Sequence, residues 1–213
     1  MTTRTKICGI KTPEMLRASI EANARFIGFV FFPPSPRHVA TDTAKELALM
    51  IPTGMRAVGL FVDPTDEELT SILGKVQLDM IQLHGSESPD RVQEIKNKFA
   101  MPIIKAIPIQ CADDLEHIPK YEAVTDWLLF DAKPPKDSAL PGGTGKSFDW
   151  GILKNQTFSK PWMLSGGLTP DNIGQALSIL SPNAVDVSSG VEKTRGEKDA
   201  DKIKAFLDTV NAL

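Results

Sequence analysis

The chain has 213 residues, of which 41% are hydrophobic and 24% are charged, as is typical of a globular protein. Its net charge of −3 and its three scattered histidines offer no basic surface for nucleic acid and indicate no particular charged partner. No secretory leader or membrane-spanning run is found, and Cys8 and Cys111 have neither disulfide nor zinc spacing, so we expect a cytoplasmic protein with reduced thiols and no membrane association.

Short apolar runs typical of buried strands alternate with helical patterns along the whole chain. The predicted strands cover residues 4–8, 26–31, 56–62, 79–83, 103–107, 127–131, 161–164 and 184–187. Helices are predicted over 13–23, 42–50, 89–99 and 199–210, with further helices after 63–65 and from about 169–171, and a weak one over 112–117. Asp63 is interpreted as a cap of the helix that follows it.

Eight strands, each followed by a helix or a long loop, predict an α/β protein with a single (β/α)₈ TIM barrel, in one domain over residues 1–213. A doubly wound open sheet is the structural alternative. It is disfavoured because no Gly-x-Gly-x-x-Gly follows the first strand and no acidic residue closes the second. The long loop 132–146 is rich in Pro, Gly and Lys, which is typical of an active-site lid.

A barrel enzyme carries its chemistry at the C-terminal ends of its strands. This rule selects Cys8, Arg37, His84, Asp131, Ser165, Asp186 and Ser189. Alternation places Lys6 on the same side of the first strand as Cys8, where its charge would favour the reactive thiolate. Cys8 is interpreted either as that reactive group or as a small buried hydrophobe. Asp131 ends an apolar strand and is either the acid partner of the thiol or an exposed loop carboxylate.

Two turns rich in small residues follow the last two strands. Gly166-Gly167 and Ser189-Gly190 lie in the two loops that bind phosphate in this fold, so we predict a phosphate site there. The alternative is that each glycine only permits a tight turn. The cluster Gly142 to Lys146, which includes Gly143 and Thr144, lacks nucleotide-binding spacing and is interpreted as the phosphate-facing edge of the lid.

Three further residues each have two possible interpretations from the sequence. The guanidinium of Arg37 suits a carboxylate, although an isolated Arg is commonly a surface residue. His84 closes the fourth strand and is either functional or a hydrogen-bonded structural residue. Asp186 lies inside the eighth strand, where an unpaired carboxylate is costly, so we expect it to meet a partner or a ligand.

Together these motifs resemble the phosphoribosylanthranilate isomerase family of tryptophan biosynthesis. The resemblance rests on Lys6 to Gly9, Gly28 to Phe31 with Ser35 to Arg37, Val58 to Val62, Ile81 to Gly85, Asp131 with Gly142 to Gly145, Leu164 to Leu168, and Asp186 to Glu192. These segments span almost the whole chain in the family's order, and only 115–126 carries no family motif.

The resemblance implies an Amadori rearrangement of N-(5-phosphoribosyl)anthranilate to 1-(2-carboxyphenylamino)-1-deoxyribulose 5-phosphate. It implies that Asp131 protonates the ribose ring oxygen as general acid and that Cys8 removes the proton from C2 as general base. It also implies that Arg37 holds the anthranilate carboxylate and that Gly166-Gly167, Ser189-Gly190 and the Gly143-Thr144 lid hold the phosphate. Asp186 and His84 would orient the substrate or the site. No metal or other cofactor is required.

Two rival functions remain open from the sequence. A metal-dependent ketopentose-phosphate epimerase shares the barrel but needs about two His and two Asp at strand ends, where only His84, Asp131 and Asp186 qualify. A non-catalytic phosphate-binding barrel would not need both Cys8 and Asp131. Nothing long and apolar is left over for an interface, so we expect a monomer whose partner is a small phosphorylated substrate.

Overall fold

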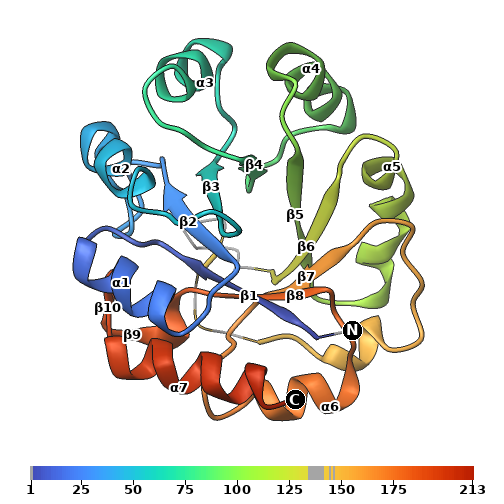
Figure 1. Ribbon diagram of the computed structural model, residues 1–213. Helices are drawn as coiled ribbons and strands as arrows, with labels where there is room; N and C mark the ends of the chain where they lie inside the picture. The colour runs from blue at the N-terminus through green and yellow to red at the C-terminus, as the bar shows by residue number, and fades with distance from the viewer. Residues whose placement is uncertain (1, 134–141, 144, 146) are drawn as a thin grey trace.

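The computed structural model describes residues 2–133, 142, 143, 145 and 147–213 (Figure 1). Eight parallel strands close into a barrel in chain order, as the sequence predicts, and the closure excludes the open sheet. The strands are β1 (Arg4–Cys8), β2 (Phe26–Val30), β3 (Arg56–Phe61), β4 (Met80–Leu83), β5 (Ile103–Ile109), β6 (Trp127–Ala132), β7 (Trp162–Leu164) and β8 (Ala184–Val187). The barrel closes where β1 pairs with β8, and Lys6 stands opposite Asp186 in that register.

Helices form a ring outside the strands (Figure 1). They are α1 (Pro13–Glu21), α2 (Thr41–Ala48), α3 (Asp66–Leu73), α4 (Pro89–Phe99), α5 (Ile118–Glu122), α6 (Ile173–Ile179) and α7 (Ala200–Asn211). Short 3₁₀ turns are η1 (Ala112–His117), η2 (Trp150–Leu153) and η3 (Ser189–Val191). The helix starts follow local chemistry, since Thr12 caps α1 ahead of Pro13 and Ser88 caps α4 ahead of Pro89.

Two local predictions differ from the structure, and one small element was not predicted. The weak helix over 112–117 is a 3₁₀ turn that runs into α5. Asp63 is not a helix cap: Thr65 caps α3, while Asp63 has a φ of 45° and accepts a hydrogen bond from Ser86 N at 2.7 Å. A small antiparallel hairpin of β9 (Glu192–Thr194) and β10 (Glu197–Lys198), which the sequence did not predict, follows η3.

Alternate strand residues face the barrel interior, as expected for a pleated strand. Apolar side chains fill the lower part of the interior, namely Phe26, Val58, Met80, Ile104, Ala106, Leu129, Met163 and Ala184. Cys8, Val30 and Leu60 form a separate apolar group. The residues with the other alternation form the large core between the strands and the helices. The strands also bury polar side chains, including Lys6, Gln82 and Asp186.

Candidate active site

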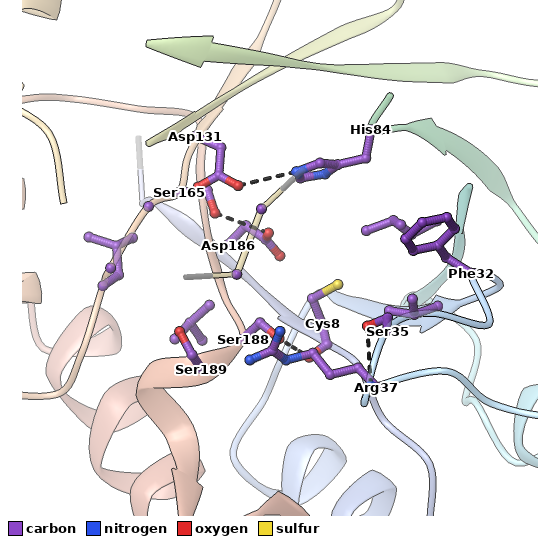
Figure 2. Close-up of a pocket in the computed structure, with 18 of the residues that line it drawn as sticks. Cys8, Phe32, Ser35, Arg37, His84, Asp131, Ser165, Asp186, Ser188 and Ser189 are labelled. Carbon is purple, nitrogen blue, oxygen red and sulfur yellow. Dashed lines mark hydrogen bonds and ion pairs between the residues drawn. The ribbon is translucent and has the colours of Figure 1, made fainter. Parts of the chain in front are cut away.

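A cavity of about 710 Å³, including its open mouth, lies at the C-terminal ends of the strands (Figure 2). The predicted residues that line it are Cys8, Arg37, His84, Asp131, Gly143, Ser165, Gly166, Gly167, Asp186 and Ser189. The predicted Gly190 is not among the lining residues, and the predicted Thr144 lies outside the described residues. The structure therefore brings almost all of the residues predicted from the strand ends to one cavity.

Cys8 ends β1, and only 4% of its surface is exposed. Burial raises the pKa of the Cys8 thiol, the ammonium of Lys6 acts in the opposite direction, and the carboxylate of Asp186 adds to the rise. The expected activation of the thiol by Lys6 is therefore present as a local effect but is smaller than the cost of burying the thiolate. A thiolate formed at this position is correspondingly a stronger base than an exposed one.

Lys6 and Asp186 form an ion pair inside the barrel, with 2.8 Å between Nζ and Oδ1. The second carboxylate oxygen of Asp186 accepts a hydrogen bond from Ser165 Oγ at 3.3 Å. Burial lowers the pKa of Lys6, but Asp186 and Cys8 together outweigh it, so the pKa is raised and the ammonium stays charged. Asp186 thus has the partner that its buried position required.

Asp131 reaches the cavity from β6, away from Cys8 in the close-up (Figure 2). Its Oδ1 accepts a hydrogen bond from Ala132 N at 2.8 Å, and its Oδ2 lies 3.2 Å from His84 Nε2. His84 Nδ1 lies 2.9 Å from Gln82 Nε2. Gln82 therefore holds the imidazole ring, and His84 in turn holds the one carboxylate oxygen of Asp131 that the backbone leaves available.

The guanidinium of Arg37 is buried and is already bound by a carboxylate. Glu192 Oε1 lies 2.7 Å from Arg37 Nε, and Glu192 Oε2 lies 3.0 Å from Arg37 Nη2. Lys198 Nζ also donates to Glu192 Oε1, at 3.0 Å. The sequence reasoning missed Glu192 and Lys198 as residues of this site, because they lie on the unpredicted hairpin β9–β10.

These contacts shift two further pKa values. Although burial alone would raise it, the hydrogen bond from Arg37 and the charge of Lys198 bring the pKa of Glu192 down to about 2. Burial lowers the pKa of Lys198 to about 8, against the attraction of Glu192. Glu192 is therefore a permanent anion at neutral pH, whereas Lys198 changes its charge in a mildly alkaline range.

The turns after β7 and β8 are built from glycines that no other residue would replace easily. Gly166 and Gly167 have φ angles of 87° and 64°, in the region that favours glycine. A Cβ at Gly190 would lie 1.8 Å from Leu168 O, so the two loops are in direct contact through this glycine. Residues of both turns line the cavity, namely Gly166, Gly167 and Ser189.

Within the part of the chain that the structure describes, no three His, Cys, Asp or Glu side chains gather as a metal site would require. Across the same residues, no helix combines the length and apolar character that crossing a membrane demands.

The family model for N-(5'-phosphoribosyl)anthranilate isomerase matches residues 5–209. The isomerase of that name from Paracoccus denitrificans is 49% identical over 207 residues, which cover 97% of this chain and 96% of the relative. The relative of the same name from Rhodospirillum centenum is 49% identical over 214 residues and covers both chains completely.

Solved structures of this enzyme have the same fold. The phosphoribosylanthranilate isomerase from Thermotoga maritima superposes with a TM-score of 0.89 at 36% identity, covering 99% of this chain and 100% of that one. A structure of such an isomerase in complex with reduced 1-(o-carboxyphenylamino)-1-deoxyribulose 5-phosphate superposes with a TM-score of 0.85 at 33% identity and the same coverage. Monomers generated from the dimeric Thermotoga maritima enzyme superpose with a TM-score of 0.84 at 33% identity, again with the same coverage.

Proposed function

The chain belongs to the N-(5'-phosphoribosyl)anthranilate isomerase family, and we propose that this isomerase of tryptophan biosynthesis uses Asp131 as general acid and Cys8 as general base. The observation that carries the proposal is that a carboxyl from β6 and a thiol from β1 line one cavity, and that the site holds each differently. The carboxyl is held by a backbone N–H and an imidazole, whereas the thiol is buried beside an ammonium.

The proposed reaction converts N-(5-phosphoribosyl)anthranilate into 1-(2-carboxyphenylamino)-1-deoxyribulose 5-phosphate. Asp131 gives its proton to the ribose ring oxygen, the bond between that oxygen and C1 breaks, and the anthranilate nitrogen forms a protonated Schiff base with C1. The Cys8 thiolate then takes the proton from C2, and the electron pair of that bond neutralises the Schiff base to give an enolamine. The enolamine tautomerises to the ketone. The cycle needs one group that donates a proton and one that accepts one.

We assign His84 the role of holding Asp131 rather than of contacting the substrate. Its Nε2 lies 3.2 Å from Asp131 Oδ2, and its ring is held from the other side by Gln82. Asp186 similarly holds Lys6 beside Cys8. Both residues line the cavity: His84 supports the acid directly, and Asp186 acts on the base through Lys6.

For substrate binding, Arg37 would hold the anthranilate carboxylate, and the turns Gly166-Gly167 and Ser189-Gly190, with Gly143 and Thr144, would hold the phosphate. The ligand of the related isomerase complex carries both a carboxyphenyl group and a 5-phosphate, which are the two groups that these positions suit. The same family membership favours the isomerase over the metal-dependent epimerase and over a barrel without activity.

The test follows the loss of anthranilate fluorescence from freshly generated phosphoribosylanthranilate with wild type, Cys8→Ser and Asp131→Asn. We expect rapid turnover by the wild type and a loss of about 10²-fold or more in each variant, since one proton transfer typically contributes 10²–10⁴-fold. Cys111→Ser removes the exposed second thiol and serves as the matched control, which should keep wild-type activity. A folded Cys8→Ser or Asp131→Asn variant with wild-type kcat/KM would refute the corresponding role.

We also propose that the chain acts as a cytoplasmic monomer of one domain over residues 1–213. Among the described residues the exposed large hydrophobic side chains are only Leu49, Met50 and Leu213, which make no broad apolar surface. The Thermotoga maritima relative is described as dimeric, so the oligomeric state of this chain has to be measured separately. Light scattering behind a sizing column should give a mass near 23.2 kDa, and a mass of twice that value would overturn the proposal.

A further inference from the structure

We propose that Glu192 is a positioning residue which aims the guanidinium of Arg37 at the carboxylate of the substrate, and that the hairpin β9–β10 holds Glu192 for this purpose. The inference rests on the role proposed above for Arg37. It adds a residue that makes no contact with the reacting atoms but sets the preference of the site for an aromatic amine that carries a carboxylate.

The geometry between the two side chains is that of a bidentate pair. A guanidinium has two edges that can bind a carboxylate, one made by Nε and one terminal nitrogen and the other made by both terminal nitrogens. Glu192 occupies the first edge of Arg37, at 2.7 Å to Nε and 3.0 Å to Nη2. Only the second edge remains for a ligand, and the orientation of that edge is fixed by Glu192.

The remaining edge belongs to a guanidinium at the wall of the cavity. Arg37 lines the cavity beside Gly143, and a Cβ at Gly143 would come within 2.4 Å of Arg37 Nη1. Among the residues that the structure describes, Nη1 has no hydrogen-bond partner, whereas Nε and Nη2 both do. The nitrogen that Glu192 leaves open therefore belongs to a guanidinium of a cavity-lining residue, and the backbone of Gly143 packs against it.

The hairpin fixes Glu192 through contacts to both of its carboxylate oxygens. Lys198 on β10 donates to Oε1 at 3.0 Å, and the backbone N–H of Gly196 in the turn donates to Oε2 at 3.0 Å. With the two bonds from Arg37, each oxygen receives two donors, so the carboxylate has no freedom to rotate. Gly196 has a φ of 86°, and a Cβ there would lie 2.7 Å from Pro36 O, so the hairpin turn packs on the chain next to Arg37.

The charges also fit this role. A carboxylate that neutralised Arg37 completely would weaken its attraction for a second carboxylate. Here Lys198 supplies a second buried cation on the same anion, so at neutral pH the group of Arg37, Glu192 and Lys198 keeps one net positive charge. A rigid arginine with one net positive charge beside it is suited to a carboxylate ligand.

The test uses two stable ligands made by reductive amination of ribose 5-phosphate, N-(5-phosphoribityl)anthranilate and N-(5-phosphoribityl)aniline, which differ only in the carboxylate. Their Kd values are measured by calorimetry with wild type, Glu192→Gln and Glu197→Gln. Glu197 lies on the same hairpin with an exposed side chain and provides the matched control. A glutamine at 192 turns an amide donor toward Arg37 or Gly196 and releases the guanidinium.

We expect Glu192→Gln to weaken the anthranilate ligand about tenfold, which corresponds to about 1.4 kcal/mol, and to leave the aniline ligand unchanged. Glu197→Gln should change neither Kd. Equal weakening of both ligands by folded Glu192→Gln would assign the hairpin a purely structural role and overturn the inference, as would no change in either. A wild type that binds the two ligands equally would instead refute the role proposed for Arg37.

A second variant covers the case in which Glu192→Gln does not fold. Glu192→Asp keeps the charge, and with it the neutralisation of two buried cations, but its side chain is one methylene shorter. It should draw Arg37 away from the cavity or lose one of its two bonds to it. The selective loss of affinity for the anthranilate ligand is expected again, and a folded Glu192→Asp with the wild-type ratio of Kd values would overturn the inference.

Discussion

Two buried lysine–carboxylate pairs sit on opposite sides of the same layer of strands. Lys6 and Asp186 face the barrel interior with 2.8 Å between Nζ and the nearest carboxylate oxygen, and Lys105 and Glu87 are separated by the same 2.8 Å. Ile104 and Ala106 face the interior, so Lys105 between them points outward. The inner pair adjoins the Cys8 thiol, whereas neither residue of the outer pair is among the residues that line the cavity.

The outer pair fastens a loop. Lys105 Nζ donates to Gly85 O at 2.8 Å, and Glu87 accepts the backbone N–H groups of Gly85 at 3.0 Å and Asp63 at 2.9 Å. These bonds tie the β3–α3 and β4–α4 loops together. A buried ion pair is thus no sign of catalysis by itself. In either place, the free-energy cost of removing the two charges from water is about as large as the gain from their attraction. What distinguishes the inner pair is that its charges change the proton affinity of a neighbouring thiol.

The largest effect is expected from removing each lysine in turn. Lys6→Met leaves Asp186 buried without its cation, and Lys105→Met does the same to Glu87, so each should lower the free energy of unfolding by about 3–5 kcal/mol. Only Lys6→Met should also reduce kcat/KM, because it removes the cation that opposes the high pKa of Cys8. Urea unfolding and fluorescence kinetics on the same samples measure both quantities.

A double variant separates activity from stability. Lys6→Met with Asp186→Leu replaces the inner pair by apolar side chains and should recover much of the lost stability. It should not recover the activity. If Lys105→Met lost as much kcat/KM as Lys6→Met at a temperature where both are folded, the distinction between the two pairs would fail.

A smaller but more direct effect is expected in the titration of the thiol itself. The chain has only two cysteines, so ¹³C-labelled cysteine gives two Cβ signals in NMR spectra, and Cys111→Ser identifies the signal of Cys8. The Cys8 signal should titrate at a higher pH than an ordinary thiol, because burial raises the pKa of this thiol despite Lys6. Lys6→Met should move the titration further upward, since the ammonium that favours the thiolate is gone.

The outer pair provides the control for this titration. Lys105 does not contribute to the pKa of Cys8, whose neighbours are Lys6, Asp186 and Lys198. Lys105→Met should therefore leave the Cys8 signal where it is in the wild type. A Cys8 signal that titrates at a lower pH than an ordinary thiol in the wild type would mean that the attraction of Lys6 outweighs burial, the reverse of the balance described here.

The two pairs also show what the sequence could and could not predict. Strand positions followed from apolar runs, and the lining of the cavity followed from the rule that chemistry lies at strand ends. The need of Asp186 for a partner was predictable, because a buried carboxylate must be compensated. That the partner is Lys6 depends on the register in which β1 meets β8, which joins residues 180 positions apart.

The hairpin β9–β10 could not be predicted either, because it too depends on contacts between residues far apart in the sequence. Its sequence from Glu192 to Lys198 is polar and carries no apolar alternation. Its position is instead fixed by tertiary bonds, above all the bond of Glu192 to Arg37, 155 residues away. The bond between His84 and Asp131 likewise joins residues 47 positions apart, at the ends of two strands that both pair with β5.

The smallest effect is expected from a hydroxyl at the edge of the outer pair. Tyr121 OH donates to Glu87 O at 3.1 Å, and its ring centroid lies 5.7 Å from Lys105 Nζ. Tyr121→Phe removes the hydrogen bond but keeps the ring beside the cation, so the free energy of unfolding should fall by about 1 kcal/mol. Tyr121→Leu also removes the ring and should cost about 0.5–1 kcal/mol more.

Neither Tyr121 variant should change kcat/KM if the outer pair serves stability alone. The chain itself offers a route by which it would do more, because Gly85, which binds both Lys105 and Glu87, directly follows His84. A shift of Gly85 would move the imidazole that holds Asp131. Unchanged kcat/KM in both variants, with the expected fall in stability, would show that the hydrogen bond of His84 to Gln82 isolates Asp131 from movements of the loop that contains Gly85. A lower kcat/KM would show that the outer pair supports Asp131, as the inner pair supports Cys8.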